Sequence, residues 1–258
     1  MNRRKFIAAS SAAGLSTAAA AENPPKNSIY SLSYFYMRNG SQVERTTAYL
    51  RDTYLPAARR HGMGPVGFFS PVFGERAPYI LSLASYPGFA AIEATHAKFG
   101  DDKEYQKGWD AYNSAGDPAF VRMEVNLLYA FDKYPTIDVP PTEAQRPARI
   151  FELRTYESLN EKAGQKKIKM FEDGEAGIFK RLGMNTVLFG RTIAGRNMPS
   201  LSYLLGYDDM AARDKLWGAF GRDPEWQKLR ATPGLSDAEI VSNISNTILR
   251  PLPFSMIR

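Results

Sequence analysis

The chain has 258 residues, no cysteine and a formal net charge of +6. The lack of cysteine excludes disulfides, thiolate metal sites and a cysteine nucleophile, so stability in an oxidising compartment would depend on packing alone. Charges of both signs are interspersed, and no cluster of Lys and Arg with interleaved aromatic residues is present, so nucleic-acid binding is not expected.

The first 21 residues have the features of an export signal. Arg3 and Arg4 precede an apolar pair, and a small-residue run continues to Ala21. This order is typical of a twin-arginine (Tat) signal cleaved after Ala20 or Ala21, and it predicts a periplasmic protein. The run is broken by Ser and Gly and falls short of the ~20 strongly apolar residues of a membrane span, so none is expected in the mature chain. Removing residues 1–21 removes three basic residues and no acid, which lowers the net charge from +6 to +3.

The rest of the chain aligns with itself. Residues 29–107 match residues 150–228 without a gap, at a constant shift of 121 (150 − 29). Two copies are too few for a solenoid, so each repeat of over 100 residues is expected to be a domain with its own core. Identical pairs include Gly62/Gly183, Phe68/Phe189, Gly74/Gly195, Tyr86/Tyr207, Phe99/Phe220 and Asp102/Asp223.

The first repeat opens with residues 29–37, whose β-branched and aromatic side chains favour a strand. Apolar positions at helical spacing predict a helix over 41–61, ended by Gly62 in a left-handed conformation. The pattern then predicts a hairpin of strands 66–73 and 79–86, a helix over 89–99, a short helix or turn from Asp102, and a strand over 121–131. Acids at Asp102 and Asp223 indicate helix N-termini.

The second repeat has the same order, with strands at 150–156, 186–193, 201–207 and 240–249 and helices at 161–182 and 210–220. The order βαββαβ is that of the ferredoxin-like unit, whose helices cover one sheet face and leave the other bare. We therefore predict an α+β chain: two tandem ferredoxin-like domains packed sheet to sheet as an intramolecular dimeric α/β barrel. The four prolines within residues 134–148 predict an extended linker between them.

The second repeat resembles a known family. Its opening, Phe151-Glu152-Leu153-Arg154-Thr155-Tyr156, is similar to the aromatic-Glu-Leu-Arg-x-Tyr opening of NIPSNAP domains, and Leu182-Gly183-Met184 fits the same comparison. The chain thus resembles a tandem NIPSNAP protein, with domains at 27–133 and 149–252. The first copy departs from the motif, since Ser31 and Ser33 replace Glu152 and Arg154. The resemblance implies a dimeric α/β barrel, a fold shared with small monooxygenases, but no agreed reaction.

Glu152 and Arg154 are the leading site candidates. They share one face of their strand with Tyr156, while Phe151, Leu153 and Thr155 share the other. We expect the Phe/Leu face to pack on the helices, which turns Glu152 and Arg154 toward the inter-sheet space. There, Arg154 could anchor an anionic or carbonyl substrate with Glu152 as its partner or as a base, or the two could form a structural ion pair that closes the barrel.

Two histidines complete the candidates. His61 precedes the helix-ending Gly62, where a cation favours the helix dipole. His96, whose counterpart at the shift of 121 is Trp217, could enter the barrel mouth as a general base or haem ligand, or could be an ordinary helix residue. No cluster with metal-ligand spacing, no Gly-x-Gly-x-x-Gly after a strand and no Walker loop is found, so neither a metal nor a flavin, NAD or other cofactor is expected.

Aromatic side chains could line a cavity or belong to the core. They are Tyr34, Tyr36, Tyr86, Trp109, Tyr112, Trp217, Phe220 and Trp226. Our leading hypothesis is an exported NIPSNAP-like protein that binds a small molecule in the inter-sheet cavity, with no assigned activity. The alternatives are a cofactor-free oxygenase, isomerase or lyase of the dimeric barrel type, and a non-catalytic protein-interaction module. The sequence leaves open whether two chains form a homodimer.

Overall fold

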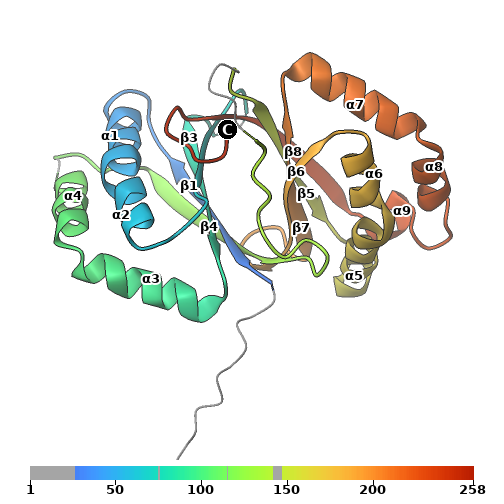
Figure 1. Ribbon diagram of the computed structural model, residues 1–258, viewed down its shortest axis with the longest axis horizontal. Coiled ribbons are helices and arrows are strands. Elements are labelled where there is room, and N and C mark those ends of the chain that lie inside the picture. Colours follow the sequence, from blue (N-terminus) through green and yellow to red (C-terminus); the bar gives the residue numbers. More distant parts are fainter. Residues whose placement is uncertain (1–26, 75, 115, 142–146) are drawn as a thin grey trace, which may run out of the picture.

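The computed structural model describes residues 27–74, 76–114, 116–141 and 147–258. In this part of the chain, eight strands form a closed barrel in the order β1-β3-β2-β8-β5-β7-β6-β4. The helices lie outside the barrel, those of the first half on one side and those of the second half on the opposite side (Figure 1). The predicted α+β fold of two ferredoxin-like halves that form one intramolecular barrel is therefore confirmed.

The first half follows the predicted order of elements. It consists of β1 (Ile29–Tyr36), α1 (Ser41–Tyr49), the π-helical turn η1 (Leu50–Tyr54), α2 (Leu55–Arg60), β2 (Gly67–Pro71), β3 (Tyr79–Tyr86), α3 (Phe89–Asp101), α4 (Lys103–Asn113) and β4 (Arg122–Ala130). Gly62 ends the first helical segment at φ 71°, as predicted from the left-handed preference of glycine. The Asp102 side chain accepts a hydrogen bond from the Tyr105 N–H at 2.9 Å, which confirms it as the N-cap of α4.

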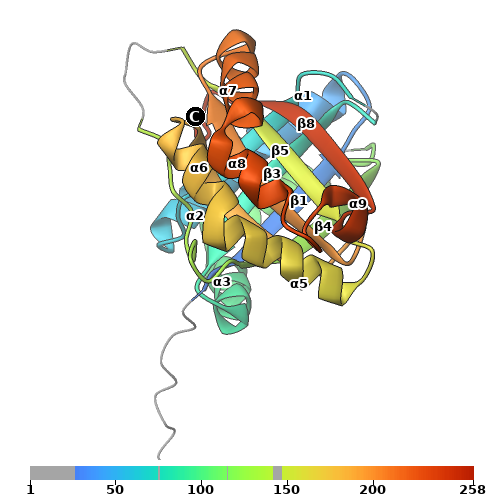
Figure 2. The ribbon, with the colours of Figure 1, turned by 90° about the vertical axis from the view of Figure 1, so that its right-hand side faces the viewer.

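The second half repeats the order with one added turn. It consists of β5 (Ile150–Glu157), α5 (Glu161–Met170), η2 (Phe171–Glu175), α6 (Ala176–Arg181), β6 (Asn185–Ala194), β7 (Ser200–Tyr207), α7 (Met210–Arg222), α8 (Pro224–Arg230), α9 (Asp237–Ile240) and β8 (Asn243–Pro251). Its helices cover their half of the barrel as one layer (Figure 2). The last strand starts later than predicted because Ser236 and Glu239 form a capping box that holds Asp237–Ile240 in the helix α9.

The two halves join at both edges of their sheets. β4 runs antiparallel to β6, and β2 runs antiparallel to β8. The C-terminal tail then continues onto the first half, where the Leu252 N–H donates to the Phe68 carbonyl at 2.8 Å and the Met256 N–H donates to the Val66 carbonyl at 3.1 Å. Ile257 is fully buried among the barrel's interior side chains. The core of the first half is therefore completed by the end of the second.

The hydrophobic core has three parts. One lies inside the barrel and draws on both halves, and one lies between each half's strands and its own helices. The described part of the proline-containing linker lies along the barrel: the Asp138 N–H donates to the Val187 carbonyl at 2.9 Å, and Ile137 and Val139 pack on the barrel core. The predicted signal, residues 1–21, lies outside the described residues. Among the helices that are described, none is long and apolar enough to cross a membrane.

Candidate functional site

The two faces of β5 are the reverse of the prediction. Phe151 and Leu153 point into the barrel, where the Phe151 ring packs at 5.2 Å from the ring of Phe69. Glu152 and Arg154 point outward, between the barrel and the second half's helices, so the prediction that they face the inter-sheet space was wrong. Both faces of a covered barrel strand are buried, so alternation shows which side chains share a face but not which face is inside.

Glu152 is fully buried and accepts five hydrogen bonds. Arg213 donates twice, at 2.8 and 2.9 Å, Arg154 and Asn246 each donate at 2.9 Å, and the Trp217 indole donates at 3.0 Å. Burial raises the pKa of Glu152, but the hydrogen bonds from Arg213 and Asn246 and the charge of Arg154 outweigh burial and lower that pKa to about 2. A carboxylate held in this way is a poor base at neutral pH.

Arg154 is enclosed by the same network. One of its terminal nitrogens donates to Glu152 at 2.9 Å and the other donates to the Tyr156 hydroxyl at 3.2 Å. Its guanidinium also lies 4.6 Å from the centre of the Trp217 ring, a cation–π distance. This arrangement favours the structural ion pair over a substrate anchor.

The histidines do not join this network. His61 caps α2, as predicted, and its Nε2 lies 2.9 Å from Asp102 Oδ2. His96 is exposed on α3, in the helical layer outside the barrel, so of its two interpretations the ordinary helix residue fits and the place at the barrel mouth does not. Within the described ranges, no group of three or more His, Cys, Asp or Glu side chains could hold a metal ion.

A pocket of about 280 Å³ opens inside the barrel, at the end where the β2–β3 and β6–β7 hairpins turn. Most of its walls are hydroxyl, amide and tyrosine side chains from seven of the eight strands. The lining residues are Tyr34, Tyr36, Arg76, Tyr79, Glu124, Asn126, Leu153, Thr155, Thr192, Arg196, Asn197, Ser200, Ser202, Ser245 and Thr247. We take this hollow, the barrel-mouth pocket, as the candidate functional site.

An ion cluster lies at the rim of the barrel-mouth pocket. Glu124 accepts from Arg196 at 2.6 Å and from the Tyr36 hydroxyl at 3.2 Å, and Arg122 and Arg76 approach its other oxygen at 2.9 and 3.9 Å. Burial raises the pKa of Glu124, but the Arg196 hydrogen bond and charge outweigh it, so the pKa lies below its ordinary value. Glu124 is therefore ionised at neutral pH.

Three tyrosines form one wall of the pocket. The Tyr34 ring lies 6.1 Å from the Tyr36 ring and 5.7 Å from the Tyr79 ring, centre to centre. Burial, followed by the neighbouring tyrosines, raises the pKa of Tyr34, and burial raises the pKa of Tyr79 to about 12. The phenols are therefore protonated at neutral pH and act as hydrogen-bond donors. Across the pocket, the Thr155 and Ser202 hydroxyls are bonded to each other at 2.8 Å.

The tips of the β2–β3 and β6–β7 hairpins form the rest of the pocket rim. Arg76 and Asn197 occupy equivalent positions at the shift of 121, and both have left-handed backbones, at φ 66° and 59°. Non-glycine residues adopt this conformation uncommonly, and Asn tolerates it better than Arg. Backbone strain of the kind found at Arg76 clusters at binding sites, which supports a role for this rim in binding.

The sequence pointed to only part of this site. Tyr34 and Tyr36 were among the aromatic cavity candidates, whereas Glu124 and Arg196 were missed. A usable signal was present: at the shift of 121, Glu124 corresponds to Ser245, so one repeat carries a charge on an inward position where the other does not. Of the other aromatic candidates, Tyr112, Phe220 and Trp226 are core residues.

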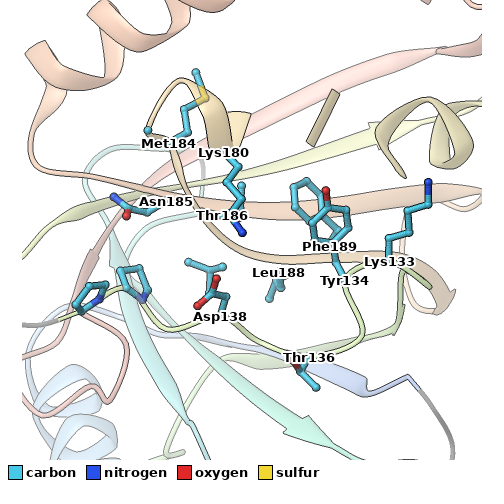
Figure 3. A pocket seen from close by; sticks show the side chains of 14 residues that line it. Lys133, Tyr134, Thr136, Asp138, Lys180, Met184, Asn185, Thr186, Leu188 and Phe189 are labelled. Carbon is cyan, nitrogen blue, oxygen red and sulfur yellow. The ribbon is translucent and has the colours of Figure 1, made fainter. Parts of the chain in front are cut away.

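A second hollow, of about 400 Å³, lies between residues 133–141 and β6. Figure 3 shows Asp138 and Lys180 on opposite sides of this groove, with Tyr134 beside Phe189. The two charged side chains are exposed, and Lys133 is already paired with Asp173 at 2.8 Å. Polar groups do not converge in this groove as they do in the barrel-mouth pocket, which is why we prefer the latter.

The fold and the internal repeat define a dimeric α/β barrel whose two halves are fused in one chain. A family comparison makes the assignment more specific: the NIPSNAP family model matches residues 151–256. The second half therefore matches the NIPSNAP domain that its opening motif resembles. A comparison with curated proteins found no significant match.

Solved structures share the whole architecture. A candidate monooxygenase from Lactobacillus acidophilus NCFM superposes with a TM-score of 0.61 at 10% identity, covering 87% of this chain and 94% of its own. An anthrone oxidase-like protein superposes with a TM-score of 0.52 at 10% identity, covering 90% and 92%. A NIPSNAP family protein from Agrobacterium tumefaciens strain C58 is 24% identical over 47% of this chain and 100% of its own, with a TM-score of 0.40. At these identities the first two matches establish a shared fold.

Proposed function

We propose that this protein binds a small organic molecule in the barrel-mouth pocket. The observation that carries the proposal is the convergence of polar side chains from seven strands on one hollow inside an otherwise apolar barrel. Polar groups are costly to place in a protein interior unless they are paired or meet water or a ligand. The volume, about 280 Å³, suits a compound of single-ring size.

The chemistry of the pocket supports binding more than proton transfer. Its tyrosines have raised pKa values and its carboxylate has a lowered one, so at neutral pH the pocket presents O–H and guanidinium donors but no side chain of intermediate pKa. Donors of this kind also stabilise an oxyanion, which keeps a cofactor-free oxygenase as the second candidate. The names of the two superposed structures, a candidate monooxygenase and an anthrone oxidase-like protein, agree with the oxygenase part of that candidate.

Pocket filling tests the proposal. Ser245 is exposed, lines the pocket and corresponds to the larger Glu124 of the first repeat, so Ser245→Trp should fill the hollow without disturbing the core. The neighbouring Ile244→Trp, on the opposite face of β8, is the matched control. In a thermal-shift screen of small aromatic and hydroxylated fragments, hits should stabilise the wild type and the control but not Ser245→Trp. Equal stabilisation of all three proteins would place binding elsewhere and overturn the proposal.

We further propose that the protein is exported through the Tat pathway. The support is the order of Arg3 and Arg4, the weakly apolar run and the small residues that end at Ala21. Export by this pathway would place a folded barrel in the periplasm, with a pocket that can be loaded before transport.

A further inference from the structure

The rim of the barrel-mouth pocket has more arginine side chains than carboxylates. Glu124 is bonded to both Arg196 and Arg122, so two guanidiniums share one carboxylate. Arg196 lines the pocket and donates to Glu124 through Nη1. Among the described residues its Nη2 and Nε have no partner. Glu124 therefore holds the Arg196 side chain in place, while the Nη2 and Nε groups of the Arg196 guanidinium stay available to a ligand.

A second donor points to the same kind of ligand. The Tyr34 hydroxyl lines the pocket and has no hydrogen-bond partner in the described part of the chain, whereas Tyr36 donates to Glu124. A protonated phenol and a guanidinium in the same pocket are suited to an acceptor oxygen rather than to another donor. Arg196 and Tyr34 thus offer matched donors at the rim and on the wall.

The walls set the shape of the rest of the ligand. The rings of Tyr34, Tyr36 and Tyr79 lie within 6.1 Å of one another, centre to centre, and Leu153 lines the pocket as well. The opposite wall is formed by small hydroxyl side chains such as Thr155 and Ser202. A space with aromatic rings on one side and hydroxyls on the other suits a flat ring that carries a polar substituent.

We infer that the ligand of the barrel-mouth pocket is a small aromatic carboxylate: its carboxylate binds Arg196 and the Tyr34 hydroxyl at the rim, and its ring lies against the tyrosine wall. The inference rests on the proposed binding function and specifies its ligand class. Glu124 acts as a positioning residue that orients Arg196, not as the anchor of a cation.

Calorimetric titration of the full chain with three matched probes tests this. The probes are 4-hydroxybenzoate, the neutral 4-hydroxybenzamide and the cationic 4-hydroxybenzylamine. The carboxylate should bind at least tenfold more tightly than the amide, the amine should not bind, and added salt should weaken carboxylate binding. Arg196→Met should reduce carboxylate affinity roughly tenfold or more and abolish the preference over the amide, with Arg196→Lys intermediate. Arg191→Met makes the same charge change outside the pocket and should leave binding unaltered.

Each contrary result has a distinct meaning. Equal binding of the amide and the carboxylate would overturn the carboxylate inference and leave small-molecule binding standing. Binding of the amine that is lost in Glu124→Gln would show a cation site and overturn it as well. Failure of all three probes to bind would overturn the inference. It would overturn the proposed function as well only if the fragment screen also found no compound whose binding is lost in Ser245→Trp.

Discussion

Replacing Glu152 by Leu should destabilise the fold strongly. The change leaves Arg154, whose side chain is 13% exposed, without its carboxylate and removes the acceptor of the Trp217 and Asn246 hydrogen bonds. Breaking a buried pair by removing one partner costs about 3–5 kcal/mol. The lowered pKa gives a similar figure, because a fall from about 4.3 in the unfolded chain to about 2 corresponds to roughly 3 kcal/mol at neutral pH. For a chain of this size the melting temperature should fall by roughly 6–20 °C.

The assay is urea unfolding followed by circular dichroism, with Ser31→Ala as the matched control. Ser31 is the counterpart of Glu152 in the first repeat, is uncharged, and its hydroxyl lies 3.3 Å from the Ser33 hydroxyl, so its replacement should cost well under about 1 kcal/mol. A folded pKa below the unfolded value means that the Glu152 contribution is present above about pH 5 and is lost as pH falls toward about 2. The difference in the free energy of unfolding between wild type and Glu152→Leu should therefore decrease as the pH falls over that range. A neutral-pH loss below about 1 kcal/mol, or a stability difference independent of pH, would show that Glu152 does not hold this network together.

Two further predictions concern the whole chain. An isolated 148–258 fragment should dimerise or aggregate, because both barrel seams and the docking site of its C-terminal tail on Val66 and Phe68 would be lost; a monomeric, cooperatively folded fragment in sedimentation would contradict the intramolecular barrel. Residues 1–21 should export a reporter that the Tat pathway accepts only when folded, and Arg3→Lys together with Arg4→Lys should stop export; unchanged export of the double variant would rule out the Tat assignment.

The repeat made the fold predictable, because the shift of 121 holds in the structure as well. β1 pairs Ile29 with Tyr86 and Tyr34 with Glu124, and β5 pairs the equivalent residues Ile150 with Tyr207 and Thr155 with Ser245. The helix end at Gly62 and the N-cap at Asp102 could be predicted from local conformational preferences. The π-helical turns η1 and η2 were not predicted, since a single extra residue per turn leaves the apolar spacing nearly unchanged.

The site was harder to predict because the two halves have diverged on opposite faces. The second half places its charges outside the barrel, at Glu152 and Arg154, where the first has Ser31 and Ser33. The first half places a charge inside, at Glu124, where the second has Ser245. Alternation along one strand cannot distinguish these cases, because the inner and outer faces are both covered. Strand pairing around the whole barrel was needed to show which charges meet at the pocket.

Ligand binding in the barrel-mouth pocket is tested most directly by a crystal structure of the protein with a screening hit bound. We expect ligand density in the barrel-mouth pocket, against the ring of Tyr34 and within hydrogen-bond distance of Arg196. Density confined to the groove between residues 133–141 and β6, with the barrel-mouth pocket unaltered, would contradict it.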